Sequence, residues 1–250
     1  MSDFYDRLTP FYHLIYGDWQ AAIDRQATQL SAIISQYWQG RVQSILDVSC
    51  GIGTQSIGLG LKGYRVTASD LSPKEIERAR HEAQQRQLDI HFSICDMRAV
   101  YHHHQTQFDL VISCDNSIPH LLEDAEILTA LKQMYQCTRA GGGCLLTIRN
   151  YDAEERGRGI VKPYGIREEA GRRYFVFQVW DFEGEVYDLS MYLIEEETHT
   201  NLATTHVMRS RYYAISVHHL SELMAKAGYV SIRRIDHQFF QPVLVGRKAT

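Results

Sequence analysis

The stretch that decides the fold is Ile45-Leu46-Asp47-Val48-Ser49-Cys50-Gly51-Ile52-Gly53-Thr54-Gln55. Its apolar beginning is typical of a buried strand, and its two glycines indicate a tight turn that leads into a helix. A second strand at residues 64–69 ends in Asp70. In a βαβ unit with this layout, the glycines let the backbone approach a ligand, and an acid at the end of the second strand accepts hydrogen bonds from ribose hydroxyls. The stretch therefore predicts a nucleoside-binding unit.

Two classes of cofactor are compatible with such a unit. A dinucleotide site has a third glycine in the pattern G-x-G-x-x-G, because that glycine permits close packing of the helix on the strand. Here Ser56 stands at the third position. The run from Asp47 to Gly53 instead resembles motif I of class I S-adenosylmethionine (SAM)-dependent methyltransferases. We expect SAM as the cofactor and S-adenosylhomocysteine (SAH) as its product, with NAD as the alternative.

Length and composition favour a soluble enzyme. With 250 residues, a net charge of -4 and a pI near 6.3, the chain can bury a full core and is expected to form one domain, residues 1–250. This charge provides no long-range attraction to phosphate backbones, so nucleic acid is not expected as a partner. No apolar run approaches the ~20 residues that span a bilayer, and the N-terminus lacks the layout of a signal peptide. The five cysteines include no C-x-x-C pair, so we expect reduced thiols in a cytoplasmic protein.

Hydrophobic periodicity predicts a first half in which strands and helices alternate. An aromatic-rich helical segment at 3–38, broken at Gly17, comes first. Ser72-Pro73 begins a helix, because serine is a good N-cap and proline fits the first turn. The elements expected after it are strands at 90–95 and 108–113, a helix at 123–139 ended by Gly141-Gly142-Gly143, and a strand at 144–148. This alternation implies a parallel sheet with helices on both faces.

The pattern changes after residue 150. Segments 174–180, 186–195 and 202–213 alternate apolar and polar residues with period two, which predicts antiparallel strands inserted before a final helix at 217–227. Strands at 230–235 and 242–245 close the chain. We divide the domain into an N-terminal aromatic helical segment (1–40), a SAM-binding core (41–150), a β insert over the acceptor pocket (151–213), and a C-terminal helix with closing strands (214–250).

Four motifs resemble those of the glycine and sarcosine N-methyltransferases. They are Leu14-Ile15-Tyr16-Gly17-Asp18, Asp115-Asn116-Ser117-Ile118-Pro119-His120-Leu121, Arg149-Asn150-Tyr151-Asp152 and Arg211-Tyr212-Tyr213. The resemblance is strongest from Ile45 to Asp152. It implies an α/β fold with the Rossmann-like seven-stranded sheet of class I methyltransferases, helices on both faces, and an antiparallel β insert before the last helix. It also implies methyl transfer from SAM to the amine of a small amino acid such as glycine or sarcosine.

The resemblance further implies which residues bind the cofactor. Asp70 would bind the ribose hydroxyls, Asp96 would face the adenine amino group, and Met97 would cover one face of the adenine. The residues expected around the methionine part are Ser49, Gly51, Gly53 and Cys114, with Arg25 at its carboxylate and Tyr16 near the sulfonium.

On the acceptor side, the resemblance implies that Arg149 binds the carboxylate of an amino acid and that Asn116 orients it. Tyr212 or Tyr213 would close the pocket. The chemistry agrees, since an arginine at the carboxyl end of a central strand can bind a carboxylate with two parallel hydrogen bonds. Methyl transfer from a sulfonium mainly requires positioned reactants and exclusion of water, so no catalytic base is named.

Other interpretations remain open at this stage. The acceptor could be the oxygen or carbon of another small metabolite or of a quinone, or the chain could be a non-catalytic SAM-binding module. His120 is interpreted as a helix-cap histidine, and Tyr101-His102-His103-His104-Gln105 as a solvated loop rather than a metal site, so no metal is expected. The sequence leaves a homo-oligomer open.

Overall fold

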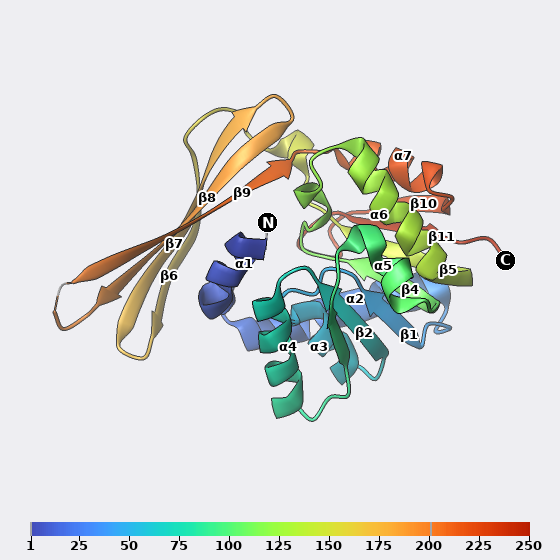
Figure 1. The fold of residues 1–250 in the computed structure, drawn as a ribbon, viewed down its shortest axis with the longest axis horizontal. Coiled ribbons are helices and arrows are strands. Elements are labelled where there is room, and N and C mark those ends of the chain that lie inside the picture. Colours follow the sequence, from blue (N-terminus) through green and yellow to red (C-terminus); the bar gives the residue numbers. More distant parts are fainter. Residues whose placement is uncertain (1, 201) are drawn as a thin grey trace.

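Two separate β-sheets organise the computed structural model, which describes residues 2–200 and 202–250 (Figure 1). In these residues the larger sheet has seven strands in the order β10-β11-β5-β4-β1-β2-β3. They are β1 (Ser44–Asp47), β2 (Arg65–Asp70), β3 (His91–Ile94), β4 (Phe108–Ser113), β5 (Thr138–Thr147), β10 (Val230–Ile235) and β11 (Val243–Arg247). Strands β3, β2, β1, β4 and β5 run parallel, whereas β11 pairs antiparallel with both β5 and β10.

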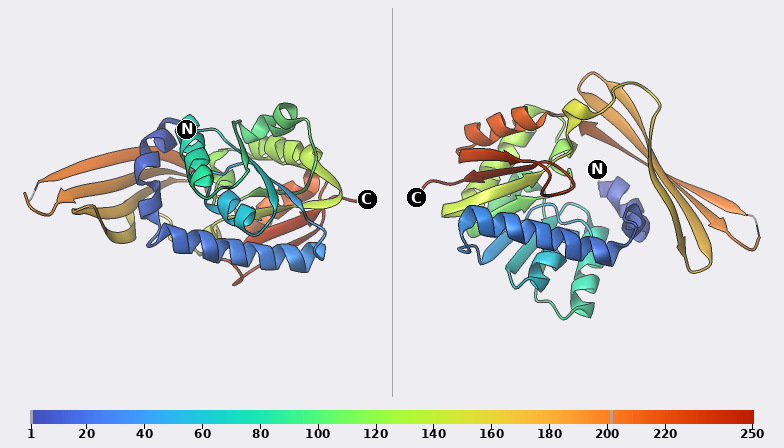
Figure 2. Two further views of the ribbon diagram at one scale, coloured as in Figure 1. Left: turned by 90° about the horizontal axis from the view of Figure 1, so that it is seen from below. Right: turned by 180° about the vertical axis from the view of Figure 1, so that it is seen from behind.

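Helices cover both faces of the seven-stranded sheet (Figure 2). One face carries α2 (Trp19–Trp38), α3 (Thr54–Leu61) and α4 (Pro73–Gln85), which share a hydrophobic core with the sheet. The other face carries α5 (Val100–His104), α6 (Asp124–Cys137) and α7 (Val217–Lys226), which share a second core. Helix α4 begins as the sequence predicts, because the Ser72 hydroxyl accepts a hydrogen bond from the N–H of Glu75. The predicted Rossmann-like sheet with helices on both faces is confirmed.

The β insert forms a four-stranded antiparallel sheet. Its strands are β6 (Ile160–Glu169), β7 (Arg172–Glu183), β8 (Val186–Glu197) and β9 (Ala203–Tyr213). Alternate residues of β7 and β8 are buried, and Trp180, Tyr187 and Met191 belong to the same core as α6 and α7. Strand β6 was not predicted from the sequence, because Pro163 and Gly165 interrupt its apolar alternation at a register shift.

The N-terminal segment lies between the two sheets (Figures 1 and 2). It comprises α1 (Ser2–Leu8) and the 3-10 helix η1 (Thr9–Ile15), and it contacts α4 as well as strands β7 and β9. Phe4, Leu8 and Leu14 are buried in the core that also holds the insert. The break at Gly17 is followed by α2, whose first turn is capped by the Asp18 carboxylate accepting from the N–H of Ala21.

Two further sequence expectations are corrected. Helix α6 ends at Cys137, and the glycine run 141–143 belongs to β5 rather than to a helix stop. A Cβ on Gly142 would lie 2.5 Å from the carbonyl oxygen of Asp109, and one on Gly143 would lie 2.5 Å from the ring of Trp38, so close packing selects glycine there. The histidine run expected in a solvated loop forms α5.

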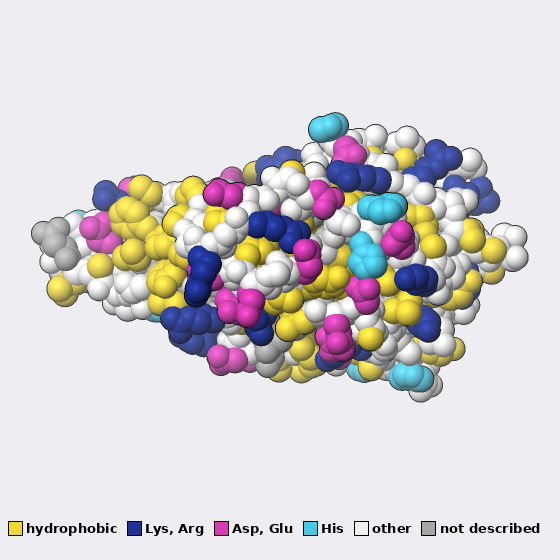
Figure 3. All heavy atoms as spheres, turned by 90° about the horizontal axis from the view of Figure 1, so that it is seen from above, with side chains coloured by type: hydrophobic (Ala, Val, Ile, Leu, Met, Phe, Trp, Pro, Cys, Tyr) yellow, Lys and Arg dark blue, Asp and Glu magenta, His cyan; other side chains and the backbone are white. Residues whose placement is uncertain are grey.

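The surface shows no concentration of one charge sign on the face in Figure 3, where Lys, Arg, Asp and Glu are interspersed. Hydrophobic side chains gather over the four-stranded sheet on that face. Val161 and Ile166 of β6 are 58% and 55% exposed. Within residues 2–200 and 202–250, no helix has both the length and the apolar character needed to cross a membrane.

Candidate functional site

Two neighbouring cavities lie at the carboxyl ends of the parallel strands, the edge at which open α/β sheets bind ligands. The smaller cavity, of about 120 Å³, is lined by Tyr5, Tyr12, Val48, Ser49, Gly51, Asp70, Leu71, Ser72, Glu75, Cys95, Asp96, Met97, Arg98, Ser117, His120 and Leu121. The larger cavity, of about 610 Å³, is lined by Phe4, Tyr5, Leu8, Tyr12, Ile15, Tyr16, Asp115, Asn116, Arg149, Asn150, Ala153, Glu154, Lys162, Pro163, Tyr164, Gln178, Tyr187, Leu189, Met191, Tyr212, Phe240, Gln241 and Pro242. Tyr5 and Tyr12 belong to both walls.

The glycine turn after β1 forms one side of the smaller cavity. Gly51 and Gly53 have φ values of +52° and +94°, a region that favours glycine. A Cβ on Gly53 would lie 2.9 Å from Cδ1 of Ile57, so this turn has no room for a side chain. Ser56, which stands where a dinucleotide site has its third glycine, donates a 2.7 Å hydrogen bond to the buried carboxylate of Asp47. Burial raises the pKa of Asp47 to about 7.

Asp70 faces this turn from the end of β2. One carboxylate oxygen accepts from the N–H of Gly51 at 2.9 Å, and the other accepts from the N–H of Ser72 at 3.0 Å. Glu75 of α4 lies beside it and is buried, and one of its carboxyl oxygens has no hydrogen-bond partner in the described part of the chain. Burial first, and then the charge of Asp70, raise the pKa of Glu75 well above its usual value. The buried carboxyl group of Glu75 and the half-buried one of Asp70 therefore face a cavity in which ribose hydroxyls would satisfy them.

The far side of the smaller cavity is formed by Asp96 and Met97 after β3. The Asp96 carboxylate caps the 3-10 helix η2 (Met97–Ala99) by accepting from the N–H of Arg98. It also pairs with the guanidinium of Arg98 at 2.6 Å. Burial alone would raise the pKa of Asp96, but the hydrogen bonds from Arg98 lower it. The Asp96 carboxylate is thus ionised, and Arg98 already takes up part of its hydrogen-bonding capacity.

Arg149, which follows β5, lies in the wall of the larger cavity. Its guanidinium lies over the ring of Trp180, with 4.7 Å between the guanidinium carbon and the ring centre. One terminal nitrogen is 3.5 Å from the carboxylate of Glu154, which pairs more closely, at 2.7 Å, with Lys162. The buried Nε of Arg149 has no hydrogen-bond partner among residues 2–200 and 202–250. Contacts with Trp180 and Glu154 therefore hold the guanidinium of Arg149 in place, and its Nε–H remains free to donate a hydrogen bond.

The backbone of Asp115 and Asn116 is in the left-handed region at two successive positions, with φ values of +56° and +65°. Each such residue costs on the order of 1–3 kcal/mol and persists only where its surroundings impose it. Here the Asn116 side chain accepts from the N–H of Arg149 at 3.0 Å and donates to the hydroxyl of Tyr151 at 2.8 Å. The conformation fixes Asn116 next to Arg149.

The Asp115 carboxylate lies half-buried in the wall of the larger cavity. It accepts hydrogen bonds from the hydroxyl of Tyr16 at 3.0 Å and from the side-chain amide of Gln241 at 3.2 Å. Burial raises the pKa of Asp115 above its usual value, while Tyr16, Arg149 and Gln241 oppose this shift. No role was predicted for this acid from the sequence.

A cluster of Tyr5, His120 and Tyr212 separates the two cavities. The Tyr5 hydroxyl lies 2.5 Å from Nε2 of His120 and 3.3 Å from the hydroxyl of Tyr212. The rings of His120 and Tyr212 are 4.1 Å apart. Burial lowers the pKa of His120 to about 3, so its imidazole is neutral at physiological pH.

The structure brings most of the expected site residues to these two cavities. Ser49, Gly51, Asp70, Asp96 and Met97 line the smaller one, and Tyr16, Asn116, Arg149 and Tyr212 line the larger one.

Four expected residues line neither cavity. Gly53 begins α3 and shapes the turn, and Cys114 is buried behind the wall. Tyr213 is turned away, since its hydroxyl donates to Asp124 at 3.1 Å. Arg25 is exposed on α2. Tyr212, not Tyr213, is thus the residue of the late tyrosine pair that reaches the cavity.

No role was predicted from the sequence for three lining residues, Glu75, Asp115 and Gln241, or for Trp180, which lies under Arg149. Trp180 and Gln241 lie in segments without a recognised motif, so no local signal marked them. Asp115 is the first residue of the quoted motif at 115–121, and an acid two residues after a buried strand was a signal that could have been used.

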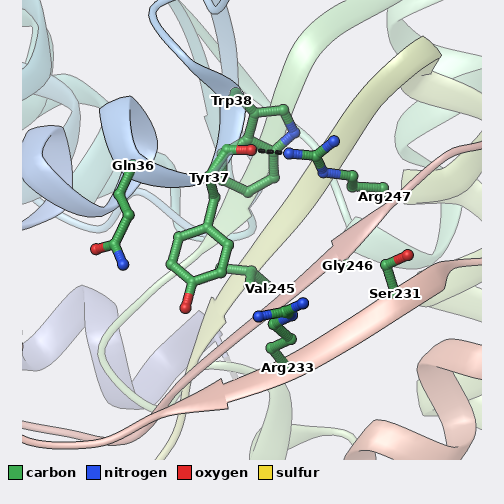
Figure 4. Close-up of a pocket in the computed structure, with 8 residues that line it drawn as sticks. All are labelled: Gln36, Tyr37, Trp38, Ser231, Arg233, Val245, Gly246 and Arg247. Atoms are coloured by element: carbon green, nitrogen blue, oxygen red, sulfur yellow. Dashed lines mark hydrogen bonds between the residues drawn. The ribbon is translucent and has the colours of Figure 1, made fainter.

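A third cavity lies elsewhere, between the end of α2 and strands β10 and β11 (Figure 4). Its lining includes Tyr37, Trp38, Arg233 and Arg247, and Arg247 donates a hydrogen bond to the carbonyl oxygen of Tyr37. Arg247 pairs with Gly143 in the middle of β5, whereas Val243, at the other end of β11, pairs with Thr147 at the carboxyl end of β5. This cavity is therefore displaced toward the opposite edge of the sheet from the two described above.

Comparison with known proteins agrees with this fold and site. Residues 45–142 match a family described as a methyltransferase domain. The glycine/sarcosine N-methyltransferase of Parasynechococcus marenigrum (strain WH8102) is 29% identical over 190 residues, which cover 70% of this chain and 65% of that protein. The glycine N-methyltransferase of Homo sapiens is 30% identical over 154 residues, covering 56% of this chain and 51% of that protein. The chain thus spans about half to two thirds of the length of these relatives.

The structure of SAM-bound CalS10, an amino pentose methyltransferase from Micromonospora echinaspora involved in calicheamicin biosynthesis, has the same fold. Its TM-score is 0.78 at 18% identity, with 91% of this chain and 92% of that chain covered. These similarities confirm the class I methyltransferase fold and the resemblance to the glycine/sarcosine N-methyltransferases. They agree with SAM as the cofactor.

Proposed function

We propose that the chain is a SAM-dependent methyltransferase that methylates the amine of a small amino acid such as glycine or sarcosine, with SAH as the product. One observation carries the choice of acceptor. Arg149 lies in the wall of the larger cavity, supported by Trp180 and with its buried Nε unpaired. A guanidinium in this state is suited to a carboxylate, because it can donate two parallel hydrogen bonds.

The smaller cavity has the donors and acceptors that SAM requires. Asp70 and the unpaired oxygen of Glu75 would accept hydrogen bonds from the ribose hydroxyls. Asp96 would face the adenine amino group, with Met97 against the ring. The methionine part would contact Ser49 and the backbone at Gly51, where the missing side chain leaves space.

The protein's own part in the reaction is positioning and the exclusion of water. SAM, when bound, supplies a methyl group on a sulfonium that is already activated toward in-line displacement by an amine. Arg149 and Asn116 would bind the carboxylate end of the acceptor and so direct its amine toward the smaller cavity. Tyr5 and Tyr12, which line both cavities, would exclude water between them.

An amino sugar is the second candidate acceptor. The larger cavity, at about 610 Å³, has more room than glycine requires. CalS10, which shares the fold, is an amino pentose methyltransferase. This candidate requires no carboxylate, so Arg149 distinguishes it from the first.

The test is a methyl-transfer screen of the purified chain with glycine, sarcosine, dimethylglycine, an amino sugar and a phenol. We expect glycine or sarcosine to be methylated. Arg149→Lys should lower kcat/KM for that acceptor at least about tenfold, because lysine keeps the charge and loses the two-pronged contact. Binding of SAH should change less than about twofold. Preference for an acceptor without a carboxylate would overturn the amino-acid assignment.

A further inference from the structure

Asp115 is a half-buried acid to which the proposed reaction assigns no role. Its carboxylate lines the larger cavity and accepts hydrogen bonds from Tyr16 and Gln241. An ionised carboxylate has about four acceptor positions, so two hydrogen bonds leave capacity for a ligand. In the described residues, Asp115 makes no ion pair within 4.0 Å of a lysine, arginine or histidine nitrogen. A carboxylate that is partly removed from water in a cavity wall and has no cation partner is suited to a cationic ligand.

The backbone holds this carboxylate in a fixed place. The N–H of Asp115 donates to the hydroxyl of Thr147 at 2.7 Å, and the N–H of Asn116 donates to the carbonyl oxygen of Thr147 at 3.2 Å. The Thr147 hydroxyl in turn donates to Gln241, the residue that donates to Asp115. These bonds impose the left-handed conformation of both residues and direct the acid into the cavity wall.

The charges around the larger cavity are arranged in two groups. Arg149, Glu154 and Lys162 form one group, since Glu154 lies 3.5 Å from Arg149 and 2.7 Å from Lys162, and this group has an excess positive charge. Asp115 forms the other. One side of the cavity is therefore positive and another is negative, which complements a molecule that carries both a carboxylate and an ammonium group.

We propose that Asp115 is a catalytic residue that binds the ammonium group of a zwitterionic acceptor and accepts a proton from it. This inference rests on the proposed function and defines the acceptor class as α-amino acids with an ionised amine. One N–H bond of the ammonium breaks and an O–H bond forms on Asp115, while the electron pair stays on nitrogen. The neutral amine can then attack the methyl carbon, the C–S electron pair goes to sulfur, and the nitrogen of the product carries the positive charge. Asp115 later loses its proton to water.

The surroundings of Asp115 are consistent with this role. The titratable or charged groups near it are Tyr12 and Tyr16 of the N-terminal segment, Cys114 on its own strand end, Arg149 after β5, and Tyr164 of β6. Burial raises the pKa of the Asp115 carboxyl, which brings it closer to that of an amine and makes proton acceptance less unfavourable. The activity should rise with pH as Asp115 ionises.

The test compares Asp115→Asn with the control Glu155→Gln. Asparagine keeps the shape and tolerates the left-handed backbone, and Glu155 is an exposed acid beside Glu154 that lines neither cavity. We expect Asp115→Asn to lower kcat/KM for glycine about 100-fold, the scale of general-base catalysis. Its residual activity should rise only as pH approaches the pKa of glycine's own amine. Glu155→Gln should keep both the rate and the pH profile.

A binding measurement separates this role from a structural one. In the complex with SAH, wild type should bind glycine more tightly than acetate, which lacks the amine. Asp115→Asn should weaken glycine binding about tenfold and leave acetate and SAH binding unchanged. An unaltered pH profile and glycine affinity in Asp115→Asn would overturn the inference while wild-type methylation of amino acids still supported the proposed function. Wild type that methylates no amine would overturn the proposed function itself.

Discussion

The two cavities differ in how the chain builds them. Apart from Tyr5 and Tyr12, the smaller cavity is lined by residues between Val48 and Leu121, all in turns after β1 to β4 or in α4. The larger cavity is lined by residues from Phe4 to Pro242, drawn from the N-terminal segment, the ends of β4 and β5, all four strands of the insert and the turn before β11. The smaller cavity is thus a product of consecutive βα turns, whereas the larger one depends on how distant segments pack.

This difference has a consequence for specificity. Turns at the ends of parallel strands are fixed by the sheet, so the smaller cavity suits a ligand common to many proteins of this fold. The insert and the N-terminal segment can vary in sequence without disturbing that sheet. We therefore expect mutations in the two regions to have separable effects on cofactor and acceptor.

The largest effect is expected for Trp180→Ala. Trp180 is fully buried between the insert and the core, and its removal should lower the free energy of unfolding by about 3–5 kcal/mol. It should also abolish tight acceptor binding, since Arg149 loses the ring on which it lies. SAH should bind nearly as before. Urea unfolding and calorimetry would measure both quantities.

Phe177→Ala is the matched control for this variant. Phe177 lies on the outer face of the same strand, half-buried and stacked on Tyr192 at 5.1 Å. Its removal should cost less stability and leave acceptor binding unchanged. If both variants weakened SAH binding as much as acceptor binding, the two regions would not be separable.

The sequence predicted the smaller cavity well because its signals are local. The glycine turn follows β1, Asp70 is the last residue of β2 and Asp96 comes two residues after β3, and strand–helix alternation predicted the sheet. The same reasoning missed Glu75, which the helical turn of α4 brings beside Asp70. Such a contact depends on how the helix packs on the sheet.

The larger cavity was predicted only where a motif marked it. Arg149 and Asn116 were found, but nothing in the sequence pairs Trp180 with Arg149 or Gln241 with Asp115, because these contacts join segments 31 and 126 positions apart. Strand β6 was missed for a related reason, since six of its ten residues are exposed and its proline and glycine disrupt the alternation. The glycine run 141–143 was misread as a helix stop because its close neighbours, Trp38 and Asp109, are distant in sequence.

An intermediate effect is expected for Asp70→Ala. If Asp70 binds the ribose hydroxyls, SAH affinity should fall by roughly 1.5–3 kcal/mol, the scale of hydrogen bonds to a charged group. Asp96→Ala should cost less, about 0.5–1.5 kcal/mol, because Arg98 already engages that carboxylate. Calorimetry with SAH ranks the two variants. A larger loss for Asp96→Ala would mean that recognition of the adenine, and not of the ribose, dominates the smaller cavity.

The smallest effect is expected for Arg25→Ala. The resemblance to the N-methyltransferases assigns Arg25 to the carboxylate of SAM, but in the structure it is exposed on α2 and lines neither cavity. An exposed substitution of this kind usually changes stability by less than about 0.5 kcal/mol, and SAH affinity should change less than about twofold. The informative comparison is with 5′-methylthioadenosine, which has no carboxylate. If Arg25→Ala weakened SAH but not 5′-methylthioadenosine, α2 would have to move on binding to bring Arg25 to the ligand. Cofactor binding in the smaller cavity would then depend on the N-terminal region as strongly as acceptor binding in the larger cavity does. Mutations in the two regions would no longer have separable effects on cofactor and acceptor.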